Sequence, residues 1–325
     1  MSKLWQKIKK PIIALAPMAD VTDAAYRAII AKYGKPSVLW TEFVSADGLV
    51  LARGVGKQKL LKDLEYSEAE RPIIAQFFTA SPENMKKAAE LASKLGFDGV
   101  DINMGCPDKS VEKQGAGAEL LKNATLAREL IRAAKDGAGG LPVSVKIRTG
   151  YSRPELEGWL PEILEEEPAV VTVHARTRKE LSKVPAQWEL VKRAVEIRDV
   201  SGGKTLILGN GDIRDLKEAR MRSEETGCDG VMLGRAIFGN PWLFSETVPT
   251  MEERLKVLIE HTRVFEKLLG SPPAGGKSFA TMKKHFKAYV SGFPGAGDLR
   301  VRLMETNNAD EVEKIISEFQ DILSL

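Results

Sequence analysis

Cysteine and histidine are scarce in this chain of 325 residues, which contains only two cysteines and three histidines. Two cysteines, Cys106 and Cys228, are too few for a disulfide framework or a four-cysteine zinc site. This shortage is typical of a protein from a reducing compartment. It also leads us to expect no bound metal.

Long apolar runs are missing as well, since no stretch approaches the roughly 18 apolar residues that a membrane helix needs. The N-terminal segment 1–20 has basic residues followed by apolar ones, as a signal peptide does. It contains Pro11 and Pro17, however, and passes directly into a patterned region, so we interpret it as a first strand. We expect a cytoplasmic protein with no membrane contact.

The net charge is small, at +3. A charge of this size does not identify a nucleic-acid-binding protein, so any basic surface must be local.

Eight short apolar runs alternate with helical segments up to about residue 245. Their apolar character is nearly continuous, which is typical of strands covered on both faces. They span residues 12–18, 37–45, 73–79, 99–105, 142–150, 169–176, 205–212 and 230–236. Eight alternations predict an α/β fold, a (β/α)8 TIM barrel, with a doubly wound open sheet as the alternative.

Only helical patterns follow the last apolar run. They span residues 250–270, 278–292 and 308–323 and predict a small C-terminal α-helical bundle. We therefore expect a catalytic barrel over residues 1–246 and a helical domain over residues 247–325.

Polar or reactive residues stand at the ends of nearly all the predicted strands. They are Met18, Glu42, Gln76, Asn103, Cys106, Lys146, Arg148, His174, Arg176, Asn210 and Arg235. Because catalytic groups of TIM barrels lie at the carboxyl ends of the strands, this pattern predicts an active site there.

Glycine-rich turns follow the seventh and eighth strands, in "LGNGDI" (208–213) and "DGVMLGRAIFGNPW" (229–242). In TIM barrels these two loops often bind phosphate through backbone amides and a short helix, and Arg235 would add a charged contact. FMN, with one phosphate, fits this pattern better than a dinucleotide, because no Rossmann glycine motif follows the first strand.

Cys106 lies on a Gly-Cys-Pro corner in "GVDINMGCPDKS" (99–110), where the chain leaves a strand. This position favours a chemical role, whereas Cys228, just before the eighth strand, is expected to be a small buried hydrophobic residue. Lys146 is predicted to point into the barrel. It could act as a Schiff-base nucleophile or as a partner of an anionic flavin ring.

Several motifs together resemble the tRNA-dihydrouridine synthase family over residues 12–244. They are "APMADVTDAAYR", "INMGCPDKSVEKQGAGAELLKN", "VKIRTGY", "VHARTR", "GNGDI" and "DGVMLGRAIFGNPWLF", and the helical tail is similar to that family's C-terminal domain. The resemblance implies an FMN-dependent enzyme that reduces the C5–C6 bond of particular uridines in tRNA. Electrons would come from a nicotinamide cofactor, NADPH or NADH.

The resemblance also implies roles for individual residues. Cys106 would be the proton donor, Asn103 would position the uracil, and Arg176 would reach the substrate nucleotide. The residues implied to contact FMN are Pro17, Met18, Gln76, Lys146, His174, Asn210, Gly211, Asp212, Gly234 and Arg235. Two positions depart from the family pattern: Ala175 replaces a common glycine, and Ser182 replaces an aromatic residue expected to contact RNA.

Basic residues gather in two segments that could bind tRNA phosphates. The first, residues 277–302, holds a single acidic residue, Asp298, and the basic residues Lys277, Lys283, Lys284, Lys287, Arg300 and Arg302. The second, after the sixth strand, holds Arg176, Arg178, Lys179 and Lys183. A uridine of folded tRNA would have to leave its stack to reach a flavin in the barrel.

Three other functions remain open on the sequence. They are a flavin-dependent dehydrogenase of free pyrimidine or dihydroorotate, a Schiff-base aldolase built on Lys146, and a tRNA-binding protein without activity. The basic tail argues against the first, because a free base needs no such surface. The sequence does not tell which uridine is modified, and we expect a monomer.

Overall fold

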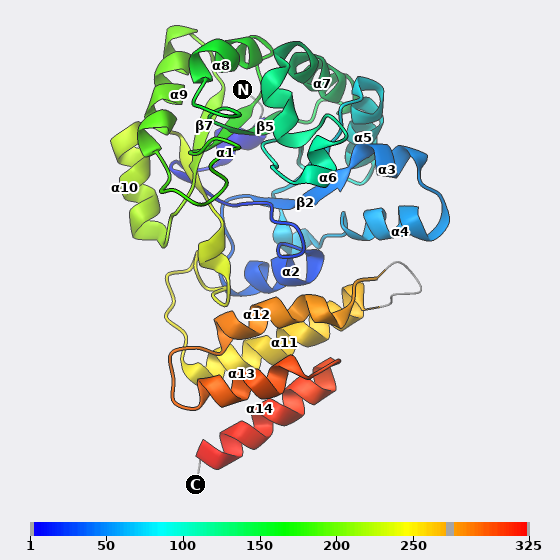
Figure 1. The fold of residues 1–325 in the computed structure, drawn as a ribbon, viewed down its shortest axis with the longest axis vertical. Coiled ribbons are helices and arrows are strands. Elements are labelled where there is room, and N and C mark those ends of the chain that lie inside the picture. The colour runs from blue at the N-terminus through cyan, green and yellow to red at the C-terminus, as the bar shows by residue number, and fades with distance from the viewer. Residues whose placement is uncertain (1–2, 271–275, 324–325) are drawn as a thin grey trace.

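The computed structural model describes residues 3–270 and 276–323, and its eight strands form one parallel sheet that closes into a barrel (Figure 1). Strand β1 pairs with β8, and a bridge between Ala14 and Val38 joins β1 to β2. The strands are β1 Ile12–Leu15, β2 Leu39–Ser45, β3 Ile73–Phe78, β4 Gly99–Met104, β5 Val143–Arg148, β6 Val170–His174, β7 Leu206–Asn210 and β8 Gly230–Leu233. The predicted (β/α)8 barrel is confirmed.

The strands are shorter than predicted, mainly because the residues after them bend into loops. Met18, for example, lies three residues beyond the end of β1. The chain before β1 is a short helix, α1 (Lys3–Lys7), which the sequence did not predict. Its Trp5 packs beside Trp40 of β2 and belongs to the apolar cluster inside the barrel.

Helices cover the outside of the barrel and bury its apolar outer face. They are α2 Ala24–Tyr33, α3 Ala46–Leu51, α4 Gly54–Lys62, α5 Pro82–Lys94, α6 Lys109–Glu112, α7 Ala124–Gly137, α8 Leu156–Glu165, α9 Trp188–Val200 and α10 Leu216–Thr226. Short 3-10 turns lie at Glu68–Glu70 (η1), Gly117–Lys122 (η2) and Arg235–Ile237 (η3). Two of these helices begin with side-chain caps: Ser81 accepts a hydrogen bond from the amide of Asn84, and Asn123 accepts one from the amide of Leu126.

The C-terminal helices lie together on one side of the barrel (Figure 1). They are α11 Met251–Leu269, η5 Phe279–Met282, α12 Lys283–Tyr289, α13 Ala296–Met304 and α14 Ala309–Leu323. A capping box of Thr250 and Glu253 begins α11. The predicted helix over 278–292 is split into η5 and α12, and α13 was not predicted.

The barrel and the C-terminal helices share one apolar core. Helix α2 of the barrel packs against α11, and Tyr26, His261 and Tyr289 are fully buried between them. The C-terminal helices are therefore fixed against the barrel by burial and not by a linker alone.

No helix within residues 3–270 and 276–323 is long and apolar enough to cross a membrane. No group of three or more His, Cys, Asp or Glu residues there could hold a metal.

Candidate active site

A cavity of about 750 Å³ opens at the carboxyl ends of the strands. This volume lies within the usual range for small-molecule sites. Most of the predicted site residues line it: Pro17, Met18, Asn103, Cys106, Lys146, His174, Arg176, Asn210, Gly211, Asp212, Gly234 and Arg235. The structure thus brings together residues from six strands or the loops after them.

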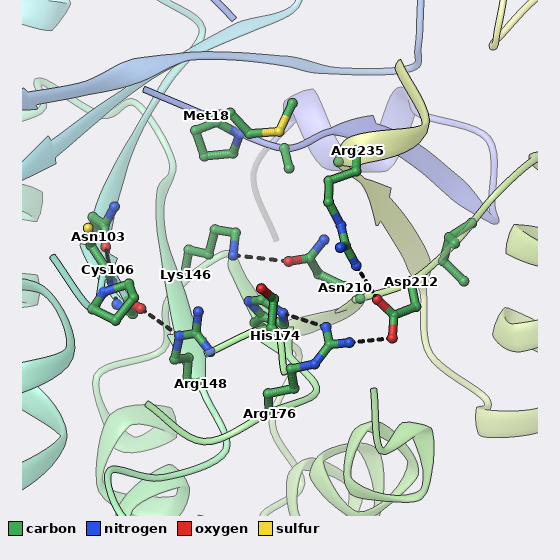
Figure 2. Close-up of a pocket in the computed structure, with 18 of the residues that line it drawn as sticks. Met18, Asn103, Cys106, Lys146, Arg148, His174, Arg176, Asn210, Asp212 and Arg235 are labelled. Carbon is green, nitrogen blue, oxygen red and sulfur yellow. Dashed lines mark hydrogen bonds and ion pairs between the residues drawn. The ribbon is translucent and has the colours of Figure 1, made fainter. Parts of the chain in front are cut away.

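The two ends of the cavity carry different functional groups (Figure 2). Cys106 and Asn103 lie at one end and Asp212 and Arg235 at the other, with Lys146 between them. Its apolar wall comes from Ala16, Pro17, Met18 and Phe43. An aromatic ring could lie against this wall, with its polar edge toward the strands.

Positive charge dominates the lining. Asp212 is its one carboxylate, against the five cationic residues Lys146, Arg148, Arg176, Arg214 and Arg235. Such an excess of cations in a partly buried space favours an anionic ligand.

Lys146 lies in the middle of the cavity on β5. Its ammonium donates to Asn210 Oδ1 at 3.1 Å. Burial, with a smaller contribution from the Arg148 charge, lowers the pKa of Lys146 to about 8. The side chain is therefore still mostly charged at neutral pH and keeps N–H groups free to meet a ligand.

His174 is neutral, because burial and the surrounding cations hold its pKa well below the usual value. Its Nε2 lies 3.2 Å from Nη1 of Arg176. A guanidinium can only donate, so Nε2 is the acceptor and the proton of the ring is on Nδ1. The imidazole thus has a fixed tautomer.

Asp212 organises the end of the cavity next to β7 and β8. It accepts hydrogen bonds from Arg176, from Arg235 at 2.5 Å and from the amide of Ala186 at 2.9 Å. Arg176 above all holds the pKa of Asp212 below its ordinary value. Because the Arg235 side chain is two-thirds exposed, it remains accessible to a ligand phosphate.

Glycines at this end of the cavity leave the backbone without side chains, so that a phosphate would have access to it. Gly211 has a φ of +138°, and a Cβ there would come within 2.8 Å of the Ala186 Cβ. Gly234 also lines the cavity, directly before the turn η3. These glycines, Asn210 and Arg235 suit a phosphate with a polar chain attached, so the residues present fit FMN.

Cys106 is held at the opposite end by a braced corner. Asn103 Oδ1 accepts hydrogen bonds from the amides of Gly105 (3.1 Å) and Cys106 (2.9 Å). The guanidinium of Arg148 donates to the Gly105 carbonyl at 2.8 Å. Burial, aided by the Asp108 charge, raises the pKa of the thiol, so Cys106 keeps its proton at neutral pH.

Gln76 is the one expected flavin contact that does not line the cavity. It is fully buried, donates to Asp101 at 2.5 Å and accepts from Asn103 at 3.1 Å. This placement makes Gln76 a support for Asn103. Its contact with the flavin stays a prediction.

Arg148 has a structural role that the sequence did not assign. Besides Gly105, it binds the carbonyls of Thr177 and Leu181 and so joins the Cys106 corner to the loop after β6. The position of Arg148 in the sequence indicates that it faces the cavity. Residues two apart on a strand share a face, and Lys146 lies two residues earlier. Phe43, Ser182 and Arg214 also line the cavity without having been proposed as site residues.

Among the residues expected to bind the tRNA substrate, Asn103 and Arg176 line the cavity, and the others lie outside it. On α12, Lys287 is exposed and Lys283 is half-buried, and the Lys284 ammonium donates to the Asp20 carbonyl at 2.5 Å. Arg178 forms an ion pair with Glu112. Contacts of these four residues with RNA stay predictions.

Lys277 corrects the sequence analysis. It was counted in the basic surface, but its side chain is only 8% exposed and pairs with Glu42. The Lys277 side chain therefore does not belong to the exposed basic surface, and an RNA contact at this residue is not tested by the structure. Cys228, in contrast, is buried at the amino end of β8 as expected.

Comparison with known proteins identifies the family. The sequence profile described as "Dihydrouridine synthase (Dus)" matches residues 14–324. A "Probable tRNA-dihydrouridine synthase" of Staphylococcus aureus (strain COL) is 38% identical over 97% of this chain and 95% of its own length. "Probable tRNA-dihydrouridine synthase 2" of Bacillus subtilis (strain 168) is also 38% identical, over 97% of this chain and 96% of its own.

Solved structures support the fold at low sequence identity. Histamine dehydrogenase from Rhizobium sp. 4-9 matches with a TM-score of 0.52 and 15% identity over 78% of this chain and 48% of its own. Morphinone reductase in complex with tetrahydroNAD matches with a TM-score of 0.50 and 14% identity over 71% of this chain and 85% of its own. The chain itself, on the profile match and the 38% identity of its relatives, belongs to the dihydrouridine synthase family, whose members are flavin-dependent oxidoreductases.

Proposed function

We propose that this protein is an FMN-dependent tRNA-dihydrouridine synthase that reduces the C5–C6 bond of specific uridines in tRNA with electrons from NADPH. The names of the relatives indicate tRNA as the class of substrate. The observation that carries the proposal is the Cys106 thiol on its braced corner, at one end of a cation-lined cavity. Such an enzyme would act in the cytoplasm, where tRNA is modified.

The residues of the cavity would hold FMN along its length. Arg235 and the backbone at Gly211 and Gly234 would bind the phosphate, and Pro17 and Met18 would lie against the ring. Lys146 and the fixed Nδ1 tautomer of His174 would contact its polar atoms. Bound FMN, once reduced by NADPH, supplies the hydride for C6 of the uracil.

Cys106 would complete the reduction by giving its Sγ proton to C5, where negative charge develops after hydride addition at C6. A thiol can do this only while protonated, and burial keeps it so. Asn103 holds the amides of Gly105 and Cys106 and thus fixes the Sγ position relative to the base. A hydrogen bond from Asn103 Nδ2 to Gln76 keeps the amide in that orientation.

The substrate nucleotide would enter from outside the barrel, turned out of its stack. Arg176, at the wall of the cavity, would meet it there. Phosphates of the surrounding tRNA would contact Arg178 and the α12 lysines Lys283, Lys284 and Lys287. We place the boundary between the catalytic barrel (1–246) and the tRNA-binding helices (247–325) in the loop before α11.

The test is to map dihydrouridine in tRNA from cells with and without the gene, together with the absorbance spectrum of the purified protein. We expect an oxidised flavin spectrum, one FMN per chain, and loss of dihydrouridine at defined tRNA positions in the deletion strain. A flavoprotein with unchanged tRNA that oxidises dihydropyrimidines would instead be a dehydrogenase of the free base. A colourless protein that takes up no FMN would contradict the proposal entirely.

A further inference from the structure

Lys277 joins the C-terminal helices to the mouth of the barrel through a cluster of charges, in which Lys277 and Glu42 are buried and the Asp20 side chain is mostly exposed. Its ammonium lies 2.6 Å from Glu42 Oε2, 3.2 Å from Asp63 Oδ1 and 3.5 Å from Asp20 Oδ1. Glu42 is on β2, Asp63 directly follows α4, and Asp20 is in the loop between β1 and α2. Three separate segments of the barrel thus meet one lysine from outside it.

The charges in this cluster depend on one another, because the Lys277 side chain is 8% exposed and that of Glu42 only 6%. Burial raises the pKa of Glu42 to about 7 although Lys277 is beside it. Burial alone would lower the pKa of Lys277, but Glu42 and Asp63 raise it above its usual value. Lys277 is thus held as a cation by its partners, and without it Glu42 would be a buried carboxylate with no counter-ion.

Asp20 connects this cluster to the loop whose earlier residues, Pro17 and Met18, line the cavity. Its amide donates to Glu42 Oε1, its carbonyl accepts from the Lys284 ammonium at 2.5 Å, and its carboxylate faces Lys277. Its φ of +55° is unusual for a residue with a side chain, so these contacts hold a conformation that the backbone alone disfavours.

The same loop carries two residues of the cavity wall. Pro17 and Met18 line the cavity two or three positions before Asp20, and the Met18 carbonyl accepts hydrogen bonds from the amides of Val21 and Thr22. Movement of Asp20 would therefore move Met18. Both Lys277 and Lys284 hold Asp20 from the side of the C-terminal helices.

We propose that Lys277 is a positioning residue: with Glu42 it fixes Asp20, and thereby sets Pro17 and Met18 in the conformation that receives the cofactor ring. The C-terminal helices, on this view, help to build the cofactor site as well as to bind RNA. The consequence for FMN rests on the proposed function, whereas the consequence for the loop does not.

The first test measures amide hydrogen exchange of peptides covering residues 16–23 in the full-length protein. Lys277→Met should speed exchange of this loop about tenfold over wild type, because it removes the cation that orders Asp20. Lys267→Met, on the exposed end of α11, is the matched control and should leave the loop unchanged. Wild-type exchange in folded Lys277→Met would overturn the proposal.

Loss of a buried cation could prevent Lys277→Met from folding. The double variant Glu42→Gln/Lys277→Met then carries the test, because it removes the unpaired carboxylate of Glu42 together with the lysine. It should still show faster exchange over residues 16–23. Wild-type exchange in the double variant would equally overturn the proposal.

The second test separates positioning from RNA contact. The FMN dissociation constant, measured by fluorescence, should rise about tenfold in Lys277→Met because the loop is no longer preorganised. The slope of log Kd for tRNA against log salt should match that of wild type, since no phosphate contact is lost. Unchanged FMN affinity with a slope reduced by about one would overturn the proposal and make Lys277 an RNA contact.

The two hypotheses fail in different ways. If wild-type protein takes up no FMN, the proposed function is wrong, while the exchange measurement still decides the role of Lys277. If wild type binds FMN and Lys277→Met equals it in both exchange and affinity, only the inference on Lys277 is wrong.

Discussion

At the scale of single residues, the site depends on polar side chains that hold other polar side chains. Asn103 and Arg148 both bind the corner of Gly105 and Cys106, one from the strand side and one from the neighbouring strand β5. A side chain at Gly105 would be crowded, since a Cβ would lie 3.2 Å from the Ile147 carbonyl carbon. Cys106 is therefore held by the hydrogen bonds of its neighbours as well as by its packing against the apolar cluster of Phe78, Val111 and Ala116.

This arrangement predicts the effect of removing the thiol. Cys106→Ala should fold, bind FMN and be reduced by NADPH, because none of these steps needs a proton at C5. Transfer from reduced flavin to the uridine should slow by roughly 10²–10⁴-fold, the usual contribution of a positioned acid. Rapid mixing of pre-reduced enzyme with tRNA measures this step as return of the oxidised flavin band.

Serine at this position is the matched comparison, since Cys106→Ser keeps the shape of the side chain. Cys106→Ser should restore little of the rate of transfer to the uridine, because a hydroxyl is a far poorer acid than a thiol near neutral pH. Wild-type rates in Cys106→Ala, with normal dihydrouridine formation, would show that another group delivers the proton.

Residues whose role follows from strand position were predictable, and residues defined by distant partners were not. Cys106, Lys146, His174 and Asn210 stand at strand ends, so the barrel pattern alone brought them together. Lys277 looked like part of a basic surface because its partner Glu42 is 235 positions away in the sequence. Nothing local distinguishes a buried lysine from a solvated one.

At the scale of elements, α12 has two different faces. His285, Phe286 and Tyr289 are buried against α2 and α11, while Lys287 is exposed and Lys283 half-exposed. Neither of these two lysines has a side-chain partner among the residues that the structure describes. Lys284 differs from them, since it donates to Asp20.

The two unpaired lysines of α12 test phosphate contact separately from the contact of Lys284 with Asp20. Lys283→Glu/Lys287→Glu should weaken tRNA binding at least tenfold and reduce the salt slope by about one per lysine. FMN content and NADPH oxidation should not change, because neither side chain lines the cavity. Binding titrations at several salt concentrations measure both quantities.

Lys192→Glu is the control for that experiment, because it reverses an exposed charge on α9 of the barrel. Equal losses of affinity in the control and in the α12 variant would mean that net charge, and not this helix, determines binding.

Most elements could be predicted because their apolar pattern is complete within a few residues. The eight strands are buried on both faces, and α5, α7 and α11 have side-chain caps at their amino ends. Helices α1 and α13 were missed, since their burial depends on contacts with the barrel floor and with α14 and not on a long repeat of their own.

At the scale of the whole molecule, the two parts meet through a buried cluster of Tyr26, His261, His285 and Tyr289. The ring centroids of Tyr26, His261 and His285 lie 4.8 Å from one another. Neither ring nitrogen of His285 has a hydrogen-bond partner in the structure. Both histidines are therefore buried in the neutral form.

This interface predicts that acid weakens the fold. Burial lowers the pKa of His285 to about 3, while in the unfolded chain it stays near 6.5. Stability is complete above pH 6.5 and falls as the pH drops below it, because only the unfolded chain takes up the proton. His285 alone should lower the free energy of unfolding by about 1.4 kcal/mol between pH 7.5 and 5.5.

Urea unfolding at the two pH values, compared between wild type and His285→Phe, isolates this contribution. Phenylalanine fills the aromatic site and cannot be protonated, so the variant should lose about 1.4 kcal/mol less than wild type. The comparison subtracts groups that titrate in both proteins, such as Glu42. Equal losses in the two proteins would show that His285 is accessible to protons in the folded state.

The floor of the barrel has a consequence for the order of events. Trp5, Trp40 and their apolar neighbours fill the interior below the cavity, so the cavity is reached only from the carboxyl ends of the strands. Reductant and uridine would then use the same entrance and would have to bind one after the other. In each turnover, the oxidised nicotinamide would dissociate before the uracil base binds. A tRNA that bound too early would block access of the reductant to the cavity.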